Sequence, residues 1–61
     1  MNVLEIFEQI KETVNNVETD VNKFDNGNNA AGTRVRKAMQ DLKALAQEMR
    51  VTVQEVKNSG K

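Results

Sequence analysis

Residues 35–56 read VRKAMQDLKALAQEMRVTVQEV, and apolar side chains recur in this segment at alternating intervals of four and three residues. Residues 3–24 repeat the same pattern. The positions that follow it are Val3, Phe7, Ile10, Val14, Val17, Val21 and Phe24 in the first half, and Val35, Met39, Leu42, Ala46, Met49, Val53 and Val56 in the second. Such a repeat, sustained over about three heptads, indicates long helices that pack at shallow angles.

The segment DNGNN at residues 25–29 separates the two patterns and has the composition of a turn. Gly27 can adopt the left-handed conformation that ends a helix, and Asn28 or Asn29 can cap the helix that follows. We therefore expect one helical hairpin domain over residues 1–61. Its predicted parts are a helix at about residues 2–25, a turn at 26–28, a second helix at about 29–57 and a frayed tail at 58–61.

The composition indicates an all-α protein that needs a partner. A chain of 61 residues buries only a small core, and chains of this size are usually stabilised by disulfides, metals or oligomerisation. Cysteine and histidine are absent, which excludes disulfides, most transition-metal sites and the commonest catalytic side chains. Ile6, Ala38 and Leu45 widen each apolar stripe to three positions, so a single antiparallel hairpin leaves half of it in water. We expect dimerisation into a four-helix bundle.

Gly32 lies inside the second predicted helix, where glycine is unfavourable. It also lies three residues before Val35, so it extends the apolar stripe. We favour a packing role, in which the first helix or Phe24 comes close to its backbone, over a break in the helix.

Charge is distributed unevenly although the net charge is zero. Residues 1–28 hold six acids and two lysines, whereas residues 29–61 hold seven basic residues and three acids. Arg36, Lys43, Arg50 and Lys57 share one heptad position at one edge of the apolar stripe. We expect Lys43, Arg50 and Lys57 to pair with acids of the first helix; a surface for an anionic partner is the alternative.

Three cations, Arg34, Arg36 and Lys37, fall at the start of the second helix. Lys37 can pair with Asp41 one turn on, but Arg34 and Arg36 have no obvious local partner. Positive charge is unfavourable near a helix N-terminus. A bound anion would explain why three cations are found there. Solubility, or pairing with acids of a second subunit, would account for it as well.

The segment GNNAAGTRVRKA at residues 27–38, followed by Leu42, Lys43 and Arg50, resembles the helical N-terminal domain of the chlamydial histone-like family, also called bacterial linker-histone-like proteins. The resemblance covers roughly residues 20–57, and the first helix agrees in pattern only. It implies a dimeric helical domain associated with DNA or the nucleoid. The nucleic-acid-binding residues that it implies are Arg34, Arg36, Lys37, Lys43 and Arg50.

The family's long Lys/Ala-rich tail is not found in these residues. We therefore expect a stand-alone version of the dimerisation domain, a homodimer that binds DNA weakly and without sequence preference through four to six phosphates per dimer. It would be cytoplasmic and nucleoid-associated, in a bacterial cell or a phage-infected host. The alternative is an oligomerisation or protein-interaction module that binds no nucleic acid. The sequence indicates neither an enzyme nor a cofactor or metal site, and it predicts no signal peptide or membrane span.

Overall fold

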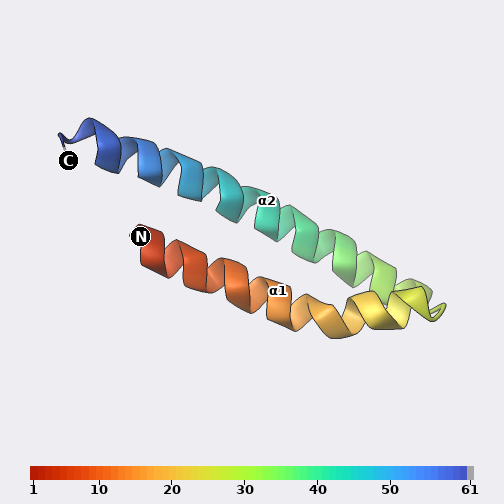
Figure 1. Ribbon diagram of the computed structural model, residues 1–61. Coiled ribbons are helices and arrows are strands. Elements are labelled where there is room, and N and C mark those ends of the chain that lie inside the picture. The colour runs from red at the N-terminus through yellow and green to blue at the C-terminus, as the bar shows by residue number, and fades with distance from the viewer. Residues whose placement is uncertain (61) are drawn as a thin grey trace.

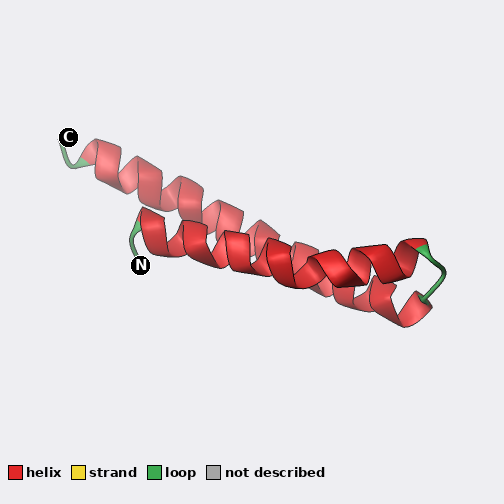
Figure 2. Ribbon diagram, turned by 60° about the horizontal axis from the view of Figure 1, so that its bottom comes forward, coloured by secondary structure: helices red, strands yellow, loops and turns green. Residues whose placement is uncertain are grey.

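The chain folds into two long antiparallel helices joined by one tight turn (Figure 1). In this computed structural model, which describes residues 1–60, α1 runs over Val3–Asp25 and α2 over Asn29–Asn58. The hairpin measures 50 × 14 × 14 Å. The C-terminal end of α2 extends past the start of α1 (Figure 2). The predicted all-α hairpin is therefore confirmed.

Side chains cap the start of both helices. The Asn2 side chain accepts a hydrogen bond of 2.9 Å from the Glu5 amide, and the Glu5 carboxylate accepts one of 3.0 Å from the Asn2 amide. This reciprocal capping box satisfies two backbone donors that α1 itself cannot. At α2, the Asn28 side chain accepts from the Ala31 amide at 3.2 Å, so Asn28 and not Asn29 is the cap.

The turn ends α1 in a Schellman motif. The Asn28 amide donates to the Lys23 carbonyl at 3.0 Å, and the Gly27 amide donates to the Phe24 carbonyl at 2.9 Å. Gly27 has a φ of +100°, a left-handed conformation that costs glycine nothing and most other residues about 1 kcal/mol or more. The turn thus occupies the three residues that the sequence indicates.

The C-terminal end differs from the expected frayed tail. Asn58 is still helical, Ser59 caps α2 through hydrogen bonds to Glu55 and Val56, and Gly60 takes a φ of +85°. The predicted tail also includes Lys61, which lies outside the described residues. Neither helix within residues 1–60 has the length and hydropathy that a membrane span requires.

The seam between the helices is narrow, and within residues 1–60 the buried side chains are Ile6, Val17 and Ala31. Half-buried side chains continue the seam on both helices: Val3, Ile10 and Thr13 from α1, and Val35, Ala38, Leu42, Leu45, Met49 and Thr52 from α2. Near the turn, the ring of Phe24 lies against Gly32, where an added Cβ would come within 2.7 Å of the ring. The helix continues through Gly32, so the packing interpretation of this glycine is confirmed.

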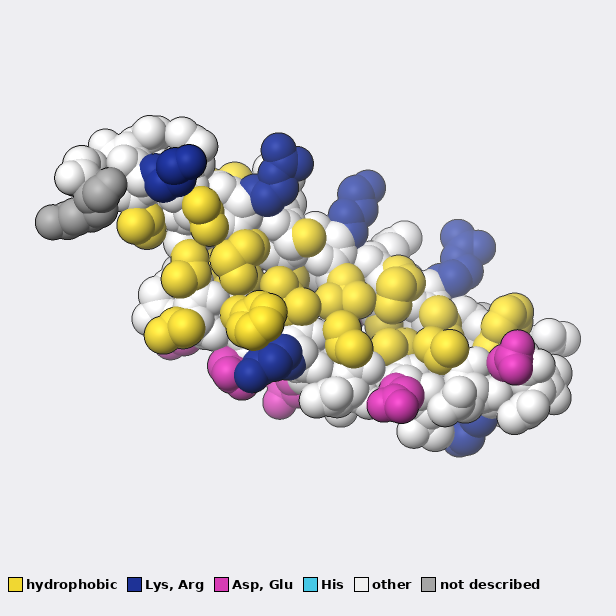
Figure 3. Space-filling view, in the orientation of Figure 1, with side chains coloured by type: hydrophobic (Ala, Val, Ile, Leu, Met, Phe, Trp, Pro, Cys, Tyr) yellow, Lys and Arg dark blue, Asp and Glu magenta, His cyan; other side chains and the backbone are white. Residues whose placement is uncertain are grey.

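Much of each apolar stripe remains in water, as expected for a single hairpin. We call this surface the open apolar face; its large members are Phe7, Val14, Val21, Phe24, Met39, Val53 and Val56, between 40% and 52% exposed. Most of them follow a seam residue by one position, as Phe7 follows Ile6 and Met39 follows Ala38. In an antiparallel pair these positions fall on the same side, and Figure 3 shows a continuous band of hydrophobic side chains across both helices.

Candidate nucleic-acid interface

The five predicted DNA-binding residues all lie on α2, but the helix separates them into two groups. Successive residues of an α-helix are rotated by about 100°. Arg34 and Lys37 therefore lie about 60° apart around the helix, whereas Arg34 and Arg36 lie about 160° apart. The three cations at the start of α2 consequently do not leave the helix toward one point.

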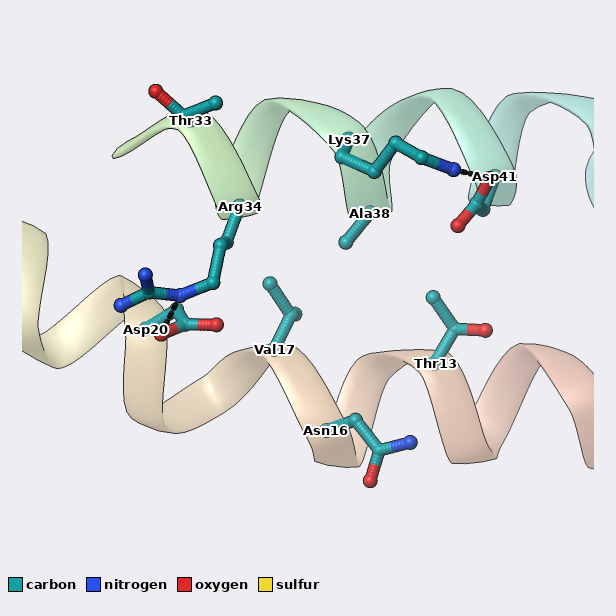
Figure 4. Close-up of a pocket in the computed structure, with 9 residues that line it drawn as sticks. All are labelled: Thr13, Asn16, Val17, Asp20, Thr33, Arg34, Lys37, Ala38 and Asp41. Carbon is teal, nitrogen blue, oxygen red and sulfur yellow. Dashed lines mark hydrogen bonds and ion pairs between the residues drawn. The ribbon is translucent and has the colours of Figure 1, made fainter. Parts of the chain in front are cut away.

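The first group, Arg34 and Lys37, lines a pocket between the two helices together with Val17 and Asp20 (Figure 4). No large member of the open apolar face lines this pocket. Arg34 Nε donates to Asp20 Oδ1 at 2.9 Å, and Lys37 Nζ to Asp41 Oδ1 at 3.3 Å. The Arg34–Asp20 ion pair joins the two helices, and Asp20 is only 20% exposed. Arg34 thus has a partner that its sequence neighbours did not suggest, while the expected pairing of Lys37 with Asp41 is confirmed.

The second group borders the open apolar face. We call Arg36, Lys43, Arg50 and Lys57 the basic row; all four side chains are exposed. Their spacing of seven residues places neighbours about 10 Å apart along α2, and the whole row spans about 32 Å. Figure 3 shows Lys and Arg side chains standing out along the α2 border of the hydrophobic band.

The basic row has no carboxylate partner among residues 1–60. Ion pairs within this part of the chain join Lys11 to Glu8, Arg34 to Asp20 and Lys37 to Asp41. The expectation that Lys43, Arg50 and Lys57 pair with acids of the first helix is therefore wrong for the isolated hairpin. The reason is geometric, since the row points along the open apolar face and away from the seam that holds α1.

Lys57 belongs to the basic row although the predicted set of DNA-binding residues omits it. Its heptad position is the signal that could have included it, because it follows Arg50 by seven residues. The described residues 1–60 contain no group of three or more acidic side chains placed to hold a metal ion.

Residues 4–59 match the family of the histone H1-like protein Hc1. No curated protein and no solved structure gave a significant match. The matched segment includes nearly all of α1, the turn, all of α2 and every member of the basic row. It therefore adds the first helix to the resemblance over roughly residues 20–57. The chain belongs to the histone H1-like protein Hc1 family.

Proposed function

We propose that this protein associates with DNA, without sequence preference, through contacts between the basic row and the phosphate backbone. The observation that carries the proposal is the row itself: four exposed cations at one heptad position, with no carboxylate partner in residues 1–60. Membership of a histone H1-like family supports it. Phosphate contact needs cations in register with the backbone and no side chains that read bases.

The dimensions of the row suit a duplex. Its length of about 32 Å is close to one turn of B-DNA, about 34–36 Å. Because a seven-residue repeat drifts by about 20° per heptad around a straight helix, the row follows a shallow spiral and not a straight line. One hairpin can therefore reach phosphates over most of one turn.

Arg34 and Lys37 take a secondary place in this proposal. Each already donates to a carboxylate, so moving to a phosphate exchanges one anionic partner for another. Their side chains are 51% and 76% exposed. Both can therefore turn toward a duplex that approaches the surface on which they lie. The basic row has no ion pair within the hairpin to give up. Its four cations therefore bind DNA first.

Fluorescence anisotropy of labelled duplexes, titrated at several salt concentrations, tests the proposal. Four phosphate contacts give a slope of log K against log[salt] of about −3.6, from about −0.9 per phosphate. The slope and the affinity should be the same for duplexes of unrelated sequence. Absence of binding at low salt would reject the proposal.

A self-association module without nucleic acid is the second candidate. The open apolar face favours it, because large hydrophobic side chains contiguous over both helices mark interaction surfaces. The zero net charge favours it too. The two candidates differ in what the basic row does: it contacts phosphates in the first and only protein in the second.

A further inference from the structure

We propose that three glutamines of α2, Gln40, Gln47 and Gln54, bind the same DNA strand as the basic row, by donating hydrogen bonds from their side-chain amides to phosphate oxygens. We call these residues the glutamine row. The inference rests on the proposed function and extends it from four cations to a strip of seven alternating side chains. It also commits to the sugar–phosphate backbone, and not to the base edges, as the surface that α2 contacts.

A heptad repeat within α2 brings the two rows together. Residues 40–57 read QDLKALAQEMRVTVQEVK, in which a glutamine is followed directly by an acid and, three residues on, by a lysine or arginine, three times over. Arg36 precedes the first glutamine by four residues. Cations and glutamines therefore alternate at intervals of four and three residues, and consecutive members lie about 40° or 60° apart around the helix. The two rows form one strip on a single side of α2.

The structure shows this strip as two shallow hollows on the surface of α2, one heptad apart. Each combines two glutamines, one cation and one short apolar side chain, all of them exposed. The first hollow is lined by Gln40, Lys43, Ala44 and Gln47, and the second by Gln47, Arg50, Val51 and Gln54. A phosphate in such a hollow can accept hydrogen bonds from the amide and from the cation together, and the short apolar side chain leaves room for the deoxyribose.

The amides of the glutamine row have donors to offer. No side-chain hydrogen bond within residues 1–60 involves Gln40 or Gln47, and Gln54 Nε2 donates to Asn58 Oδ1 at 3.2 Å. A side-chain amide carries two N–H donors, so Gln54 retains one beside this bond. Glutamine is among the side chains that contact phosphates and sugars in protein–DNA complexes.

The acids of α2 point away from the strip. The helix contains three, Asp41, Glu48 and Glu55, and each directly follows a glutamine. Each acid therefore points about 100° away from the glutamine before it and about 160° away from the cation two residues after it. The glutamine row separates the cations from the acids. A phosphate on the strip meets cations and neutral amides before it meets a carboxylate, although the whole chain has no net charge.

The same arrangement favours the backbone over the major groove. A helix in that groove lies between the phosphates of two strands and needs favourable side chains on both of its flanks. On α2 the flank beyond the basic row is the open apolar face, and the flank beyond the glutamine row passes over Ala44 and Val51 to the three acids. The strip can therefore bind one strand, and its amides reach phosphates and sugars and not base edges. This accounts for binding without sequence preference.

Replacing Gln40, Gln47 and Gln54 together by alanine tests the inference in the anisotropy titration of a labelled duplex. We expect the affinity to fall by about fivefold for each lost hydrogen bond, and by roughly a hundredfold in total. The slope of log K against log[salt] should stay near about −3.6, because a neutral donor releases no counterion. Alanine is the strongest helix former, and circular dichroism verifies that α2 is intact.

The matched control replaces Gln9, Asn15 and Asn16 together by alanine, since these amides line a hollow on α1 beside Glu8 and Glu12. It should bind DNA as the original chain does. A glutamine-row variant that binds no more weakly than this control would overturn the inference and leave the basic row as the DNA-binding site. A slope that falls with the affinity would overturn it too, because the glutamines would then act by holding the cations in place. Absence of binding by the original chain at low salt would reject the proposed function itself.

An added charge gives the opposite readout. Gln47 is shared by both hollows, so Gln47→Lys should add one phosphate contact, raise the affinity and steepen the slope from about −3.6 to about −4.5. Gln9→Lys adds the same charge on α1 and should leave the slope near that of the original chain. Equal slopes for the two variants would show that position 47 does not lie against the backbone of the duplex, and would overturn the inference.

Discussion

The ring of Phe24, near the end of α1, lies so close to Gly32 in α2 that a Cβ there would come within 2.7 Å of its Cδ1 and Cε1 atoms. Glycine inside a helix is unfavourable by about 1 kcal/mol relative to alanine. At this position it makes room for the ring of Phe24 beside the turn. The helix tolerates Gly32 because the contact with Phe24 offsets its low propensity.

Gly32→Ala should therefore fail to stabilise the protein, and we expect a loss of about 1 kcal/mol in the free energy of unfolding because the ring must leave its place. The matched control is the same substitution in a Phe24→Ala background, where it should stabilise by about 1 kcal/mol through helix propensity alone. Urea denaturation followed by circular dichroism measures both. Equal effects in the two backgrounds would show that the ring of Phe24 is not what makes alanine unfavourable at position 32.

The Asp20–Arg34 ion pair supports the hairpin more than it supports DNA binding. Asp20 is mostly covered, so removing its partner leaves a carboxylate poorly solvated. Arg34→Gln should lower the free energy of unfolding by about 1 kcal/mol, at the upper end for partly exposed pairs. It should reduce DNA affinity less than Arg36→Gln, which removes a cation without a partner in the hairpin. If Arg34→Gln instead left stability unchanged and abolished DNA binding, the ranking of the two groups would be reversed.

Self-association should depend on the middle of the open apolar face. Val14 is 47% exposed there, and Val14→Glu would place a charge in the interface of a dimer. We expect sedimentation to show a monomer, and thermal unfolding to lose its dependence on protein concentration. Asn15→Glu is the control, since Asn15 lies one position away on the polar surface of α1 and should change neither measurement.

The same variant distinguishes bridging from simple binding. Beads that carry one duplex should retain a second, labelled duplex only when a protein with two basic rows joins them. Val14→Glu should abolish this retention while anisotropy still reports binding to single duplexes, with a salt slope close to that of one row. Retention of the labelled duplex by the monomeric variant would show that one hairpin contacts two duplexes by itself.

The sequence predicted the hairpin well because its signals are local. A strict heptad pattern, the absence of proline and a Gly/Asn turn act within a few residues of one another, so Asn28, Gly27 and the helices lie where the pattern indicates. The heptad pattern could not predict which part of each apolar stripe faces the other helix. Ile6 is completely buried while Phe7 is half exposed, and this choice depends on how the turn sets the rotation of α1 against α2.

The candidate site was harder to predict for the same reason. Arg34 and Arg36 are neighbours in the sequence but point to opposite sides of α2, and the partner of Arg34 lies fourteen residues away on α1. Sequence proximity suggested one cluster, whereas helix rotation makes two groups. The heptad position shared by Arg36, Lys43 and Arg50 is the better guide to which cations lie on one side of α2, since it depends on helix rotation alone.

The last prediction concerns the basic row as a unit. Replacing Arg36, Lys43 and Arg50 by glutamine leaves Lys57 as the only member of the row, so the slope of log K against log[salt] should fall in magnitude from about 3.6 to about 0.9. The control replaces three lysines that belong to neither group, Lys11, Lys23 and Lys61, by glutamine and changes the net charge by the same amount. If the row makes the contacts, the control should keep a slope near that of the original chain and lose little affinity. An equal fall in both triple variants would mean that DNA responds to the net charge of the protein and not to the line of cations along α2, because only an arranged set of contacts distinguishes two proteins of the same charge.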